Sequence, residues 1–406
     1  MTPRRVLGVL ATAELLAMAP WFSASAVAPA LTRVWHLSPA GTAWLTISVQ
    51  LGFVAGALVS AVLTLADRWS ARRLVVGSAA LAAVATGCVA LAPGPGVGIA
   101  CRMLTGAALA GVYPPGMKIV AGWFRDGRGW AIGILVGALT LGSAAPHLVR
   151  WAAPPEAWRL VLGIAAASAL AGGLLVLAVP HDGPFAAPSP PFSWSAAPRI
   201  LRDRAVLLAN LGYLGHMWEL YAMWTWMAVF VAASERLRRG AGGEGGTETT
   251  ALAALVTFAV VGSGAIGCWL GGKYADRWGR TLVTSAAMVV SGSCAIAAGL
   301  FFGGPLAALV PLLLLWGVTV VADSAQFSTA VSELAPADYV GTALTLQTSM
   351  GFLLTCATIY LLPAVAAAIG WRWSMSALAI GPALGVWAML ALRRRPEAAR
   401  LAGGRR

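Results

Sequence analysis

Long apolar stretches separated by short polar ones follow one another along the whole chain. An α-helix needs about twenty apolar residues to cross a hydrocarbon core of roughly 30 Å. Twelve stretches of this kind are present, at residues 6–30, 41–66, 74–92, 97–121, 129–149, 159–179, 204–233, 250–271, 281–302, 305–331, 340–363 and 372–391. The pattern therefore predicts an all-α membrane protein with twelve transmembrane helices. The longest polar stretches, 180–203 and 234–249, are too short to enclose a core of their own.

The composition supports the same class of protein. Apolar residues make up 59% of the 406 residues and charged residues only 11%, whereas soluble proteins carry about 25% charged residues. Residues 1–23 resemble a secretory signal, but Glu14 interrupts their apolar run and no small-residue cleavage site follows, which favours a retained first helix. The five cysteines lie inside predicted spans without metal-ligand spacing, so we expect no metal and no other cofactor.

The net charge of +13 would suggest a nucleic-acid partner in a soluble protein. Its distribution gives a different explanation. With the N-terminus inside, 19 of the Lys and Arg residues fall in inner segments and seven in outer ones. Basic residues gather on the cytoplasmic side of membrane proteins, so both termini are predicted to be cytoplasmic, in the cytoplasmic (inner) membrane, with lipid rather than nucleic acid as the partner. The one local exception is the outer segment that contains Arg236, Arg238 and Arg239.

Two short sequences occur twice at nearly the same spacing. Ala-Asp-Arg-Trp at 66–69 returns at 275–278, and Trp-Arg at 158–159 returns at 371–372. Internal repeats of this kind are common in transporters. They predict a six-helix half, a cytoplasmic linker, a second six-helix half and a basic tail, at residues 1–180, 181–203, 204–392 and 393–406.

The second repeated segment carries a longer pattern. Residues 272–280 read G-x-x-x-D-R-x-G-R, while the first copy has Leu63, Ser70 and Ala71 where the pattern has Gly, Gly and a basic residue. In this pattern the chain resembles the major facilitator superfamily across essentially its whole length. The resemblance implies a fold of two six-helix halves and a cytoplasmic gating motif, whose residues here are Asp67, Arg68, Gly272, Asp276, Arg277, Gly279 and Arg280.

Two further segments carry the resemblance. Residues 102–106 look like an R-x-x-x-G motif that this family often ties to proton coupling, and residues 113–124 are similar to bacterial permeases of the cyanate and nitrate type. Helix five lacks the adjacent Gly-Pro of drug and proton antiporters, which favours symport.

Five ionisable residues lie well inside predicted spans, namely Glu14, Arg102, Lys118, Glu219 and Asp323. Burying each costs about 2.5–3.5 kcal/mol, so such residues are hypotheses for function. They occur in helices one, four, seven and ten, which the resemblance implies line a central cavity. The structural alternative is that an acid pairs with a neighbouring donor merely to hold helices together. For Lys118, near the inner end of its helix, snorkelling to the interface is the preferred interpretation.

Helical spacing adds neighbours to these residues. Tyr113 shares a stripe with Arg102, and Gln326 shares one with Asp323. His216 and Glu219, three residues apart, are either a proton relay or a mutually satisfied structural pair. The predicted substrate- and proton-binding residues are Glu14, Arg102, Tyr113, His216, Glu219, Asp323 and Gln326.

Roles follow for the charged members of this set. Arg102 is predicted to hold an anionic group of the substrate or a buried acid, so that Arg102→Ala abolishes uptake without loss of expression. Proton coupling is predicted through Glu14 or Asp323, with Glu219 as the third candidate.

The sequence as a whole predicts a monomeric, proton-coupled secondary transporter that moves a small solute, anionic if Arg102 binds it, by alternating access. A proton-driven exporter of hydrophobic or drug-like compounds is the alternative, because Met18, Met217, Met223 and Trp226 would give an apolar cavity. No sequence pattern of a metal or nucleophile site points to an enzyme or to catalytic residues. For the gate, Asp276→Asn is predicted to be more damaging than Asp67→Asn, because the first copy has lost both glycines.

Overall fold

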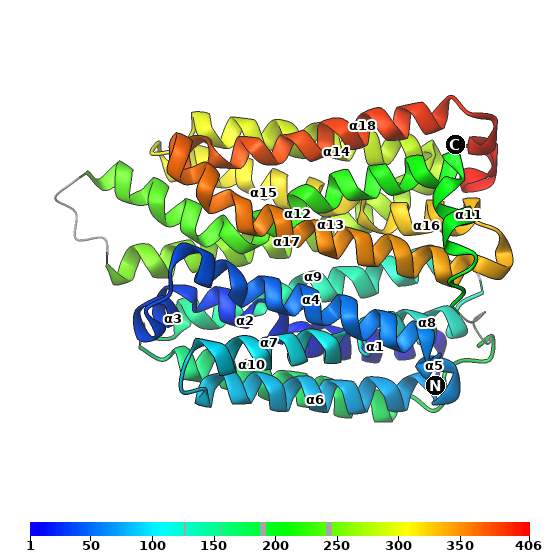
Figure 1. Ribbon diagram of the computed structural model, residues 1–406, viewed down its shortest axis with the longest axis horizontal. Coiled ribbons are helices and arrows are strands. Elements are labelled where there is room, and N and C mark those ends of the chain that lie inside the picture. The colour runs from blue at the N-terminus through cyan, green and yellow to red at the C-terminus, as the bar shows by residue number, and fades with distance from the viewer. Residues whose placement is uncertain (126, 155, 187–191, 241–245) are drawn as a thin grey trace.

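The computed structural model describes residues 1–125, 127–154, 156–186, 192–240 and 246–406, and these form helices without any strand (Figure 1). Residues 187–191 of the predicted linker lie outside the described residues. The first half contains α1 (Pro3–Met18), α2 (Pro20–Ala26), α3 (Ala28–Trp35), α4 (Pro39–Val62), α5 (Leu65–Arg68), α6 (Ala71–Leu91), α7 (Pro95–Leu109), α8 (Tyr113–Trp123), α9 (Arg128–Ala152), α10 (Trp158–Leu175) and η1 (Val176–Ala178).

The rest of the chain repeats this architecture. It contains α11 (Ala197–Arg202), α12 (Arg204–Arg239), α13 (Thr247–Trp278), α14 (Arg280–Leu300), α15 (Leu306–Ala322), α16 (Ser324–Leu334), η2 (Ala337–Tyr339), α17 (Val340–Ser374), η3 (Met375–Ala379), α18 (Ile380–Arg393) and η4 (Pro396–Gly404). The tail is not free, because η4 packs back on the bundle with Ala398 and Leu401 fully buried.

Ten helical segments within the described residues are long and apolar enough to cross a membrane. The last of them, Ala337–Arg393, spans both α17 and α18 and is broken at Gly370, which has a φ of 78°. The 36-residue α12 is not among the ten, and it carries the buried polar residues Asn210, His216 and Glu219. The all-helical membrane fold is therefore confirmed, while the number of twelve spans and their orientation stay predictions.

Close glycine contacts recur in the two halves at one spacing. A side chain at Gly106 would overlap the carbonyl oxygen of Val49, where α7 crosses α4. A side chain at Gly317 would overlap the carbonyl oxygen of Val260, where α15 crosses α13, and both of these residues lie 211 positions further along the chain. The same spacing relates the contact of Gly56 with Ala107 to that of Gly267 with Val318. Small residues let membrane helices approach closely, so the repeat lies in the packing as well as in the motif.

Gly317→Val is expected to lower the stability of the protein by about 1–3 kcal/mol, because the added carbons must push α15 away from α13. Gly163→Val is the matched control, since Gly163 lies on α10 with no neighbouring atom within 4 Å. Thermal unfolding in detergent measures both. Equal unfolding midpoints for the two variants would show that the close crossing is not required.

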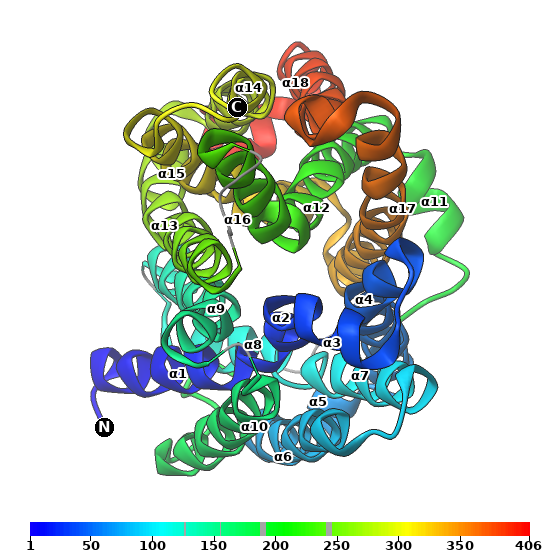
Figure 2. The same cartoon turned by 90° about the vertical axis from the view of Figure 1, so that its left-hand side faces the viewer.

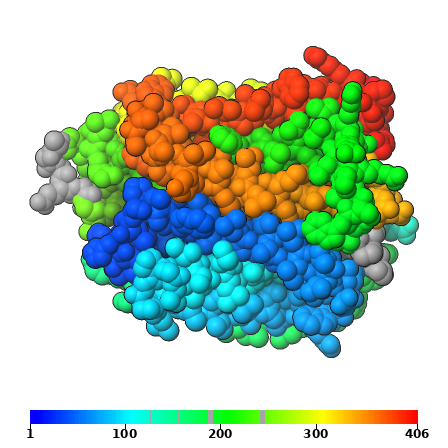
Figure 3. Space-filling view, in the orientation of Figure 1, coloured from blue at the N-terminus to red at the C-terminus, as the bar shows by residue number. Residues whose placement is uncertain are grey.

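The two halves meet along two pairs of helices, α9 with α13 and α4 with α17. Figure 2 shows the first half, in blue and cyan, below the second, with both pairs at the boundary. The space-filling view shows the same two layers in contact along the molecule (Figure 3). The interior between the two pairs is bordered by α2 and α12, and α12 carries the predicted site residues His216 and Glu219.

Three predicted spans are broken rather than continuous. The first is divided into α1, α2 and α3, with Pro20 opening α2 and a turn at Val27 (φ −106°). The fourth is divided between α7 and α8, where Pro114 and Pro115 occupy the first turn of α8. The tenth is divided at Asp323, between α15 and α16. Proline lacks an N–H, and backbone groups freed at such breaks must find partners inside the protein.

Candidate functional site

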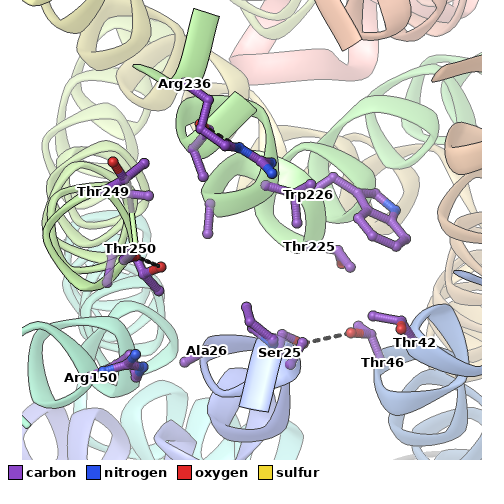
Figure 4. Close-up of a pocket in the computed structure, with 18 residues that line it drawn as sticks. Ser25, Ala26, Thr42, Thr46, Arg150, Thr225, Trp226, Arg236, Thr249 and Thr250 are labelled. Atoms are coloured by element: carbon purple, nitrogen blue, oxygen red, sulfur yellow. Dashed lines mark hydrogen bonds between the residues drawn. The ribbon is translucent and has the colours of Figure 1, made fainter. Parts of the chain in front are cut away.

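A cavity of about 320 Å³ lies between the halves, at the end of the molecule predicted to face outward (Figure 4). Its walls come from α2, α4 and α9 of the first half and from α12 and α13 of the second. Ser25 and Thr46 bond to each other across the floor, with their hydroxyl oxygens 2.6 Å apart. The polar lining residues are Ser25, Thr42, Thr46, Arg150, Thr225, Arg236, Thr249 and Thr250. We call this space the outer cavity.

Aromatic rings from both halves pack together one or two helical turns deeper than the outer cavity. The ring centroid of Trp21 lies 5.9 Å from that of Tyr221 and 5.6 Å from that of Phe352. Phe53 lies 4.6 Å from Phe352. This group, the aromatic layer, consists of Trp21, Phe22, Phe53, Tyr221, Trp224 and Phe352. Because its rings come from both halves, it separates the outer cavity from the interior, and any movement of the halves must rearrange it.

Polar side chains, all of them buried except the half-buried Tyr113, gather deeper still, on α1, α8, α12 and α17 and at the break between α15 and α16. We call them the polar core, and its members are Glu14, Tyr113, Asn210, Tyr213, His216, Asp323 and Gln347. Tyr113 is close enough to Glu14 of its own half and to Tyr213 of the other half to interact electrostatically with both. Among the described residues, no hydrogen-bond partner is present for one oxygen of Glu14, for either amide atom of Asn210, for Nε2 of His216 or for Oε1 of Gln347.

Buried polar groups are nearly always paired in proteins. The unpaired polar groups here come from both halves and lie on the interior side of the aromatic layer. Such groups are typical of a site whose hydrogen-bond partners change during function. The sequence predicted Glu14, Tyr113, His216 and Asp323 for such a site, and the structure brings them together. Asn210, Tyr213 and Gln347 were not among the predicted site residues.

The ionisable centre of the polar core is a histidine and aspartate pair. Nδ1 of His216 lies 2.9 Å from Oδ1 of Asp323, and their side chains are 1% and 2% exposed. Asp323 stands at the break between α15 and α16, so its carboxylate projects from the point where that helix is interrupted. The imidazole packs near the rings of Tyr213 and Phe327, at centroid distances of 6.1 Å and 5.6 Å.

Glu219 does not belong to this pair. Its carboxylate accepts hydrogen bonds from the hydroxyl of Ser291 at 2.8 Å and from Nε1 of Trp316 at 2.7 Å. The mutual pair of His216 with Glu219 is therefore wrong for this structure, and a relay that includes both stays a prediction. Residues three apart share a helix face, but these two side chains meet different neighbouring helices.

Arg102 has other partners than the predicted anion or acid. The fully buried guanidinium donates to the carbonyl oxygens of Leu45 at 3.1 Å and of Pro20 at 2.6 Å, and also to that of Trp21. Pro20 and Trp21 open α2, so the arginine holds the first turn of α2 against Leu45 of α4. The expectation that Arg102 pairs with an acid is corrected, because backbone carbonyls already occupy its donors.

Gln326 also lies elsewhere than predicted. Its side-chain oxygen accepts a hydrogen bond from Nη1 of Arg280 at 2.7 Å, at the end of the second half that is predicted to be cytoplasmic. The same guanidinium forms two bonds with the carboxylate of Glu333, at 2.8 Å and 2.7 Å. Gln326 thus contacts Arg280 of the gating motif and does not belong to the polar core. Glu333 was missed by the sequence, because it lies just beyond the end of a predicted span.

The two copies of the gating motif have different surroundings. In the first copy, Asp67 forms an ion pair with Lys118 of the same half. The sequence predicted only that Lys118 reaches the membrane interface, so this ion pair is an additional finding. In the second copy, Asp276 lies 3.7 Å from Arg280 and beside Gly129, in the first turn of α9 from the other half. A helix N-terminus favours a negative charge. Asp276 of the second copy therefore contacts the first half across the boundary between the halves.

The remaining motif residues divide by burial. Arg68 and Arg277 are exposed at matching positions. Gly279 has a φ of 90° and packs against the backbone of Arg405 and Arg406, so glycine is required there. Gly272, by contrast, has no atom within 4 Å of the position where a Cβ would stand, so no close contact in this structure requires glycine there.

The sequence profile described as the Major Facilitator Superfamily matches residues 10–359. The chain belongs to this superfamily. Solved structures agree in fold. The chain is similar to the proton:xylose symporter XylE (14% identity, 97% of this chain and 95% of that one covered, TM-score 0.73) and to the nucleoside transporter NupG (15%, 95% and 99%, 0.71). It is also similar to the human organic anion transporter MFSD10 (15%, 96% and 100%, 0.70). No curated protein matches the chain in sequence.

Membership of the Major Facilitator Superfamily makes the protein a multi-pass membrane transporter for a small-molecule substrate, and not an enzyme. The solved structures share at most 15% of their residues with this chain, so they give its fold and leave its substrate open. The narrower similarity to cyanate and nitrate permeases stays a prediction.

Proposed function

We propose that this superfamily member is a proton-coupled symporter that carries a small solute across the cytoplasmic membrane by alternating access. Residues 1–180 and 204–392 act as the two moving halves, and residues 181–203 connect them. The observation that carries the proposal is the pairing of His216 with Asp323, because it puts a titratable pair at a helix break, inside the polar core and between the halves.

The physical basis of coupling is the cost of isolated charge in a water-poor interior. A protonated histidine beside an ionised aspartate has no net charge and can stay buried. Loss of the proton leaves the carboxylate beside a neutral imidazole, and the site then favours hydration or a new partner. Nε2 of His216, which has no partner among the described residues, is the atom at which a solute could sense this change. Binding of solute and of proton would thereby depend on each other.

Glu14 is the second candidate for the proton in this proposal. It is 3% exposed and approaches α8 beside Gly116. One of its oxygens lacks a partner in the described part of the chain. Glu14 and Asp323 belong to different halves, so a proton on Glu14 would affect the contact between the halves from the opposite side. Asp323 is preferred because its histidine partner gives it a titratable group at hydrogen-bonding distance.

Alternating access is supported by the arrangement of the two ends. The outer cavity occupies one end, while the aromatic layer and the α9 and α13 pair close the path towards the other. Given the predicted orientation, this is an outward-facing form with its inner gate shut. Ligand binding can shift such an equilibrium only through a difference in affinity between the two forms.

Asp276→Asn is expected to shift the protein towards the inward-open form, because the carboxylate lies beside the first turn of α9 in the other half. Asp67→Asn is the matched variant, and it should shift the equilibrium less, because the ion pair of Asp67 with Lys118 lies within one half. A difference of about 1–2 kcal/mol corresponds to a five- to thirtyfold change in populations. Spin-label distances across the cytoplasmic ends of α4 and α17 report both. A larger opening in Asp67→Asn would assign the gate to the first copy.

A second candidate function is export of hydrophobic compounds. It is favoured by the aromatic layer together with Met18 and Met217, which are buried next to it. An apolar substrate would then bind among these rings instead of at the polar core. Resistance of cells to lipophilic cations, measured with and without the protein, distinguishes the two functions, because the symporter should give none.

The proposed function is tested first by finding a ligand. Purified protein in detergent is screened by thermal unfolding against monocarboxylates, sugars and nucleosides, since a ligand that binds the folded state raises its apparent stability. A compound that stabilises the protein is then offered to proteoliposomes under an imposed pH gradient. Accumulation that a protonophore abolishes supports the proposal, and accumulation that is insensitive to the protonophore contradicts proton coupling.

A further inference from the structure

Arginines from both halves line the outer cavity. Arg150 approaches from the end of α9 and Arg236 from the end of α12, and Figure 4 shows them on opposite sides of the space. Each uses one donor on a nearby backbone carbonyl. Arg150 donates to Ala153 at 3.1 Å, and Arg236 donates to Ala232 at 3.2 Å. A guanidinium has five N–H donors, so most of each fork is left for another partner.

Two carboxylates near this end, those of Glu235 and Glu248, are already paired with other arginines. The carboxylate of Glu156 interacts electrostatically with Arg150 without forming an ion pair, and the positive charge of Arg33 also acts on Arg150. Arg238 and Arg239 bond to Glu235 at distances of 2.6–2.7 Å and hold the pKa of its carboxyl at about 2. Arg239 also pairs with Glu248 at 3.2 Å. Among the described residues no carboxylate lines the cavity, and no ion pair includes Arg150 or Arg236. The outer cavity is therefore electropositive.

The other residues that line the outer cavity add polar and apolar surface beside this positive charge. Thr249 is buried, and its hydroxyl has no hydrogen-bond partner among the described residues, although it lies on the cavity wall. Trp226 is fixed on the opposite wall, because its Nε1 donates to the carbonyl oxygen of Ile359 at 3.0 Å. Val229 and several alanines complete an apolar side. The volume of about 320 Å³ has room for roughly ten water-sized groups.

We infer that the outer cavity is an entry and recognition site for small organic oxyanions, with the anionic group on Arg150 and Arg236 and an apolar body against Trp226. This names the substrate class of the transporter and so rests on the proposed function. Arginine forks recognise carboxylates and similar planar oxyanions with two parallel hydrogen bonds. Clefts of one charge also concentrate ions of the opposite charge.

This inference explains the exception in the charge distribution. Arg236, Arg238 and Arg239 oppose the rule that puts basic residues inside. Arg238 and Arg239 neutralise Glu235, while Arg236 is left facing the cavity. Arg236 at the mouth of an anion-binding site would help to bind the substrate, which explains a basic residue on the outer side.

The test measures charge selection directly and needs no known substrate. Thr225→Cys puts a thiol on the cavity wall, in a background where Cys88, Cys101 and Cys356 are replaced by alanine. Thr225 bonds to the carbonyl oxygen of Tyr221 one turn earlier, so cysteine is a conservative replacement. The thiol is treated with an anionic methanethiosulfonate reagent (ethylsulfonate) and with a cationic one (ethyltrimethylammonium). Each rate is divided by the rate with a free small thiol.

The corrected rate should be higher for the anionic reagent. Replacing both arginines, as Arg150→Gln with Arg236→Gln, should lower the anion-to-cation ratio roughly tenfold, the size expected for two charges at about 10 Å in a water-filled cavity. A ratio cancels changes in the reactivity of the thiol itself. Arg236→Gln alone, whose side chain is exposed and not required for folding contacts, should lower it about threefold. The matched control is Arg159→Gln, an outer arginine that bonds to the carbonyl oxygen of Ala90 outside the cavity, and it should leave the ratio unchanged.

Equal ratios in the parent protein and in both arginine variants would overturn the inference. A thiol that reacts with neither reagent would also overturn it, because the cavity would then not admit solutes from outside. Failure of the proposed function has a different signature. In that case the ratio falls as expected, and an anion that stabilises the protein is bound without proton-driven accumulation.

Discussion

Asp323→Asn is expected to abolish proton-driven accumulation while leaving exchange of labelled for unlabelled solute. Coupling of one proton to one solute makes a gradient of one pH unit worth about 1.4 kcal/mol, or tenfold accumulation. Asparagine cannot pass between charged and neutral forms beside His216, so the accumulation ratio should fall from about ten to about one. Exchange needs only binding and movement of the loaded protein, and asparagine retains the shape and hydrogen-bonding capacity of the site.

Glu219→Gln is the matched control for this variant. Glu219 is as deeply buried as Asp323 and lies on the same helix as His216, but it bonds to Ser291 and Trp316 inside the second half. Glutamine can still accept a hydrogen bond from either donor, so accumulation should stay within about threefold of the parent value. If Glu219→Gln uncouples transport and Asp323→Asn does not, the proton site has been assigned to the wrong acid.

Arg102→Ala is expected to destabilise the protein severely, and this result would separate structure from binding. Removal of the guanidinium takes a charged donor from the buried carbonyl oxygens of Leu45, Pro20 and Trp21, of which Pro20 keeps the hydroxyl of Ser23, at about 1–3 kcal/mol for each lost bond. We therefore expect a large fall in the thermal midpoint and in the yield of folded protein. The sequence predicted that this variant would lose uptake but be expressed normally. The contacts in the structure instead predict that it is unstable.

Arg68→Ala is the control for loss of an arginine, since Arg68 is exposed and its removal should give a midpoint within a few degrees of the parent protein. Arg102→Lys should recover part of the stability, because one ammonium can reach some of the carbonyls but lacks the planar fork. If the Arg102→Ala protein folds normally but does not transport, Arg102 has a role in binding and not in stability.

Much of the fold could be read from the chain because the bilayer restricts what a segment can do. An apolar stretch of twenty residues has few alternatives to a helix. The repeated Asp-Arg-Trp segments predicted the two halves, and the contacts at Gly106 and Gly317 show the same repeat in packing. Continuity of the helices could not be read in this way. The break at Asp323 has no proline or glycine beside it and depends on tertiary contacts.

The candidate site was predictable only in part, for one physical reason. Helical periodicity tells which residues share a face, and not which neighbour that face meets. Glu14 and Asp323 were identified by the cost of burying charge, and they do lie in the polar core. The same cost of burial singled out Arg102 and Glu219. In the structure, backbone carbonyls bind Arg102, and a tryptophan bonds to Glu219. Gln326 followed the stripe of Asp323, but the helix break between them turned it towards Arg280.

Contacts between distant segments left no signal in the sequence. The aromatic layer joins residues of four helices, and none of them was among the predicted site residues. Arg150 and Arg236 were counted as topology signals, although both line the outer cavity. Their role depends on the meeting of α9 and α12, which a single sequence does not reveal.

The central claim is that movement of solute and movement of protons are one process through Asp323. It is tested most directly in proteoliposomes that contain a pH-sensitive dye and no imposed gradient, to which a stabilising ligand is added outside. The account predicts that the ligand acidifies the interior with the parent protein and with Glu219→Gln, and that Asp323→Asn admits labelled ligand without acidification. Acidification that persists in Asp323→Asn, or entry of ligand through the parent protein with no proton movement, would contradict it.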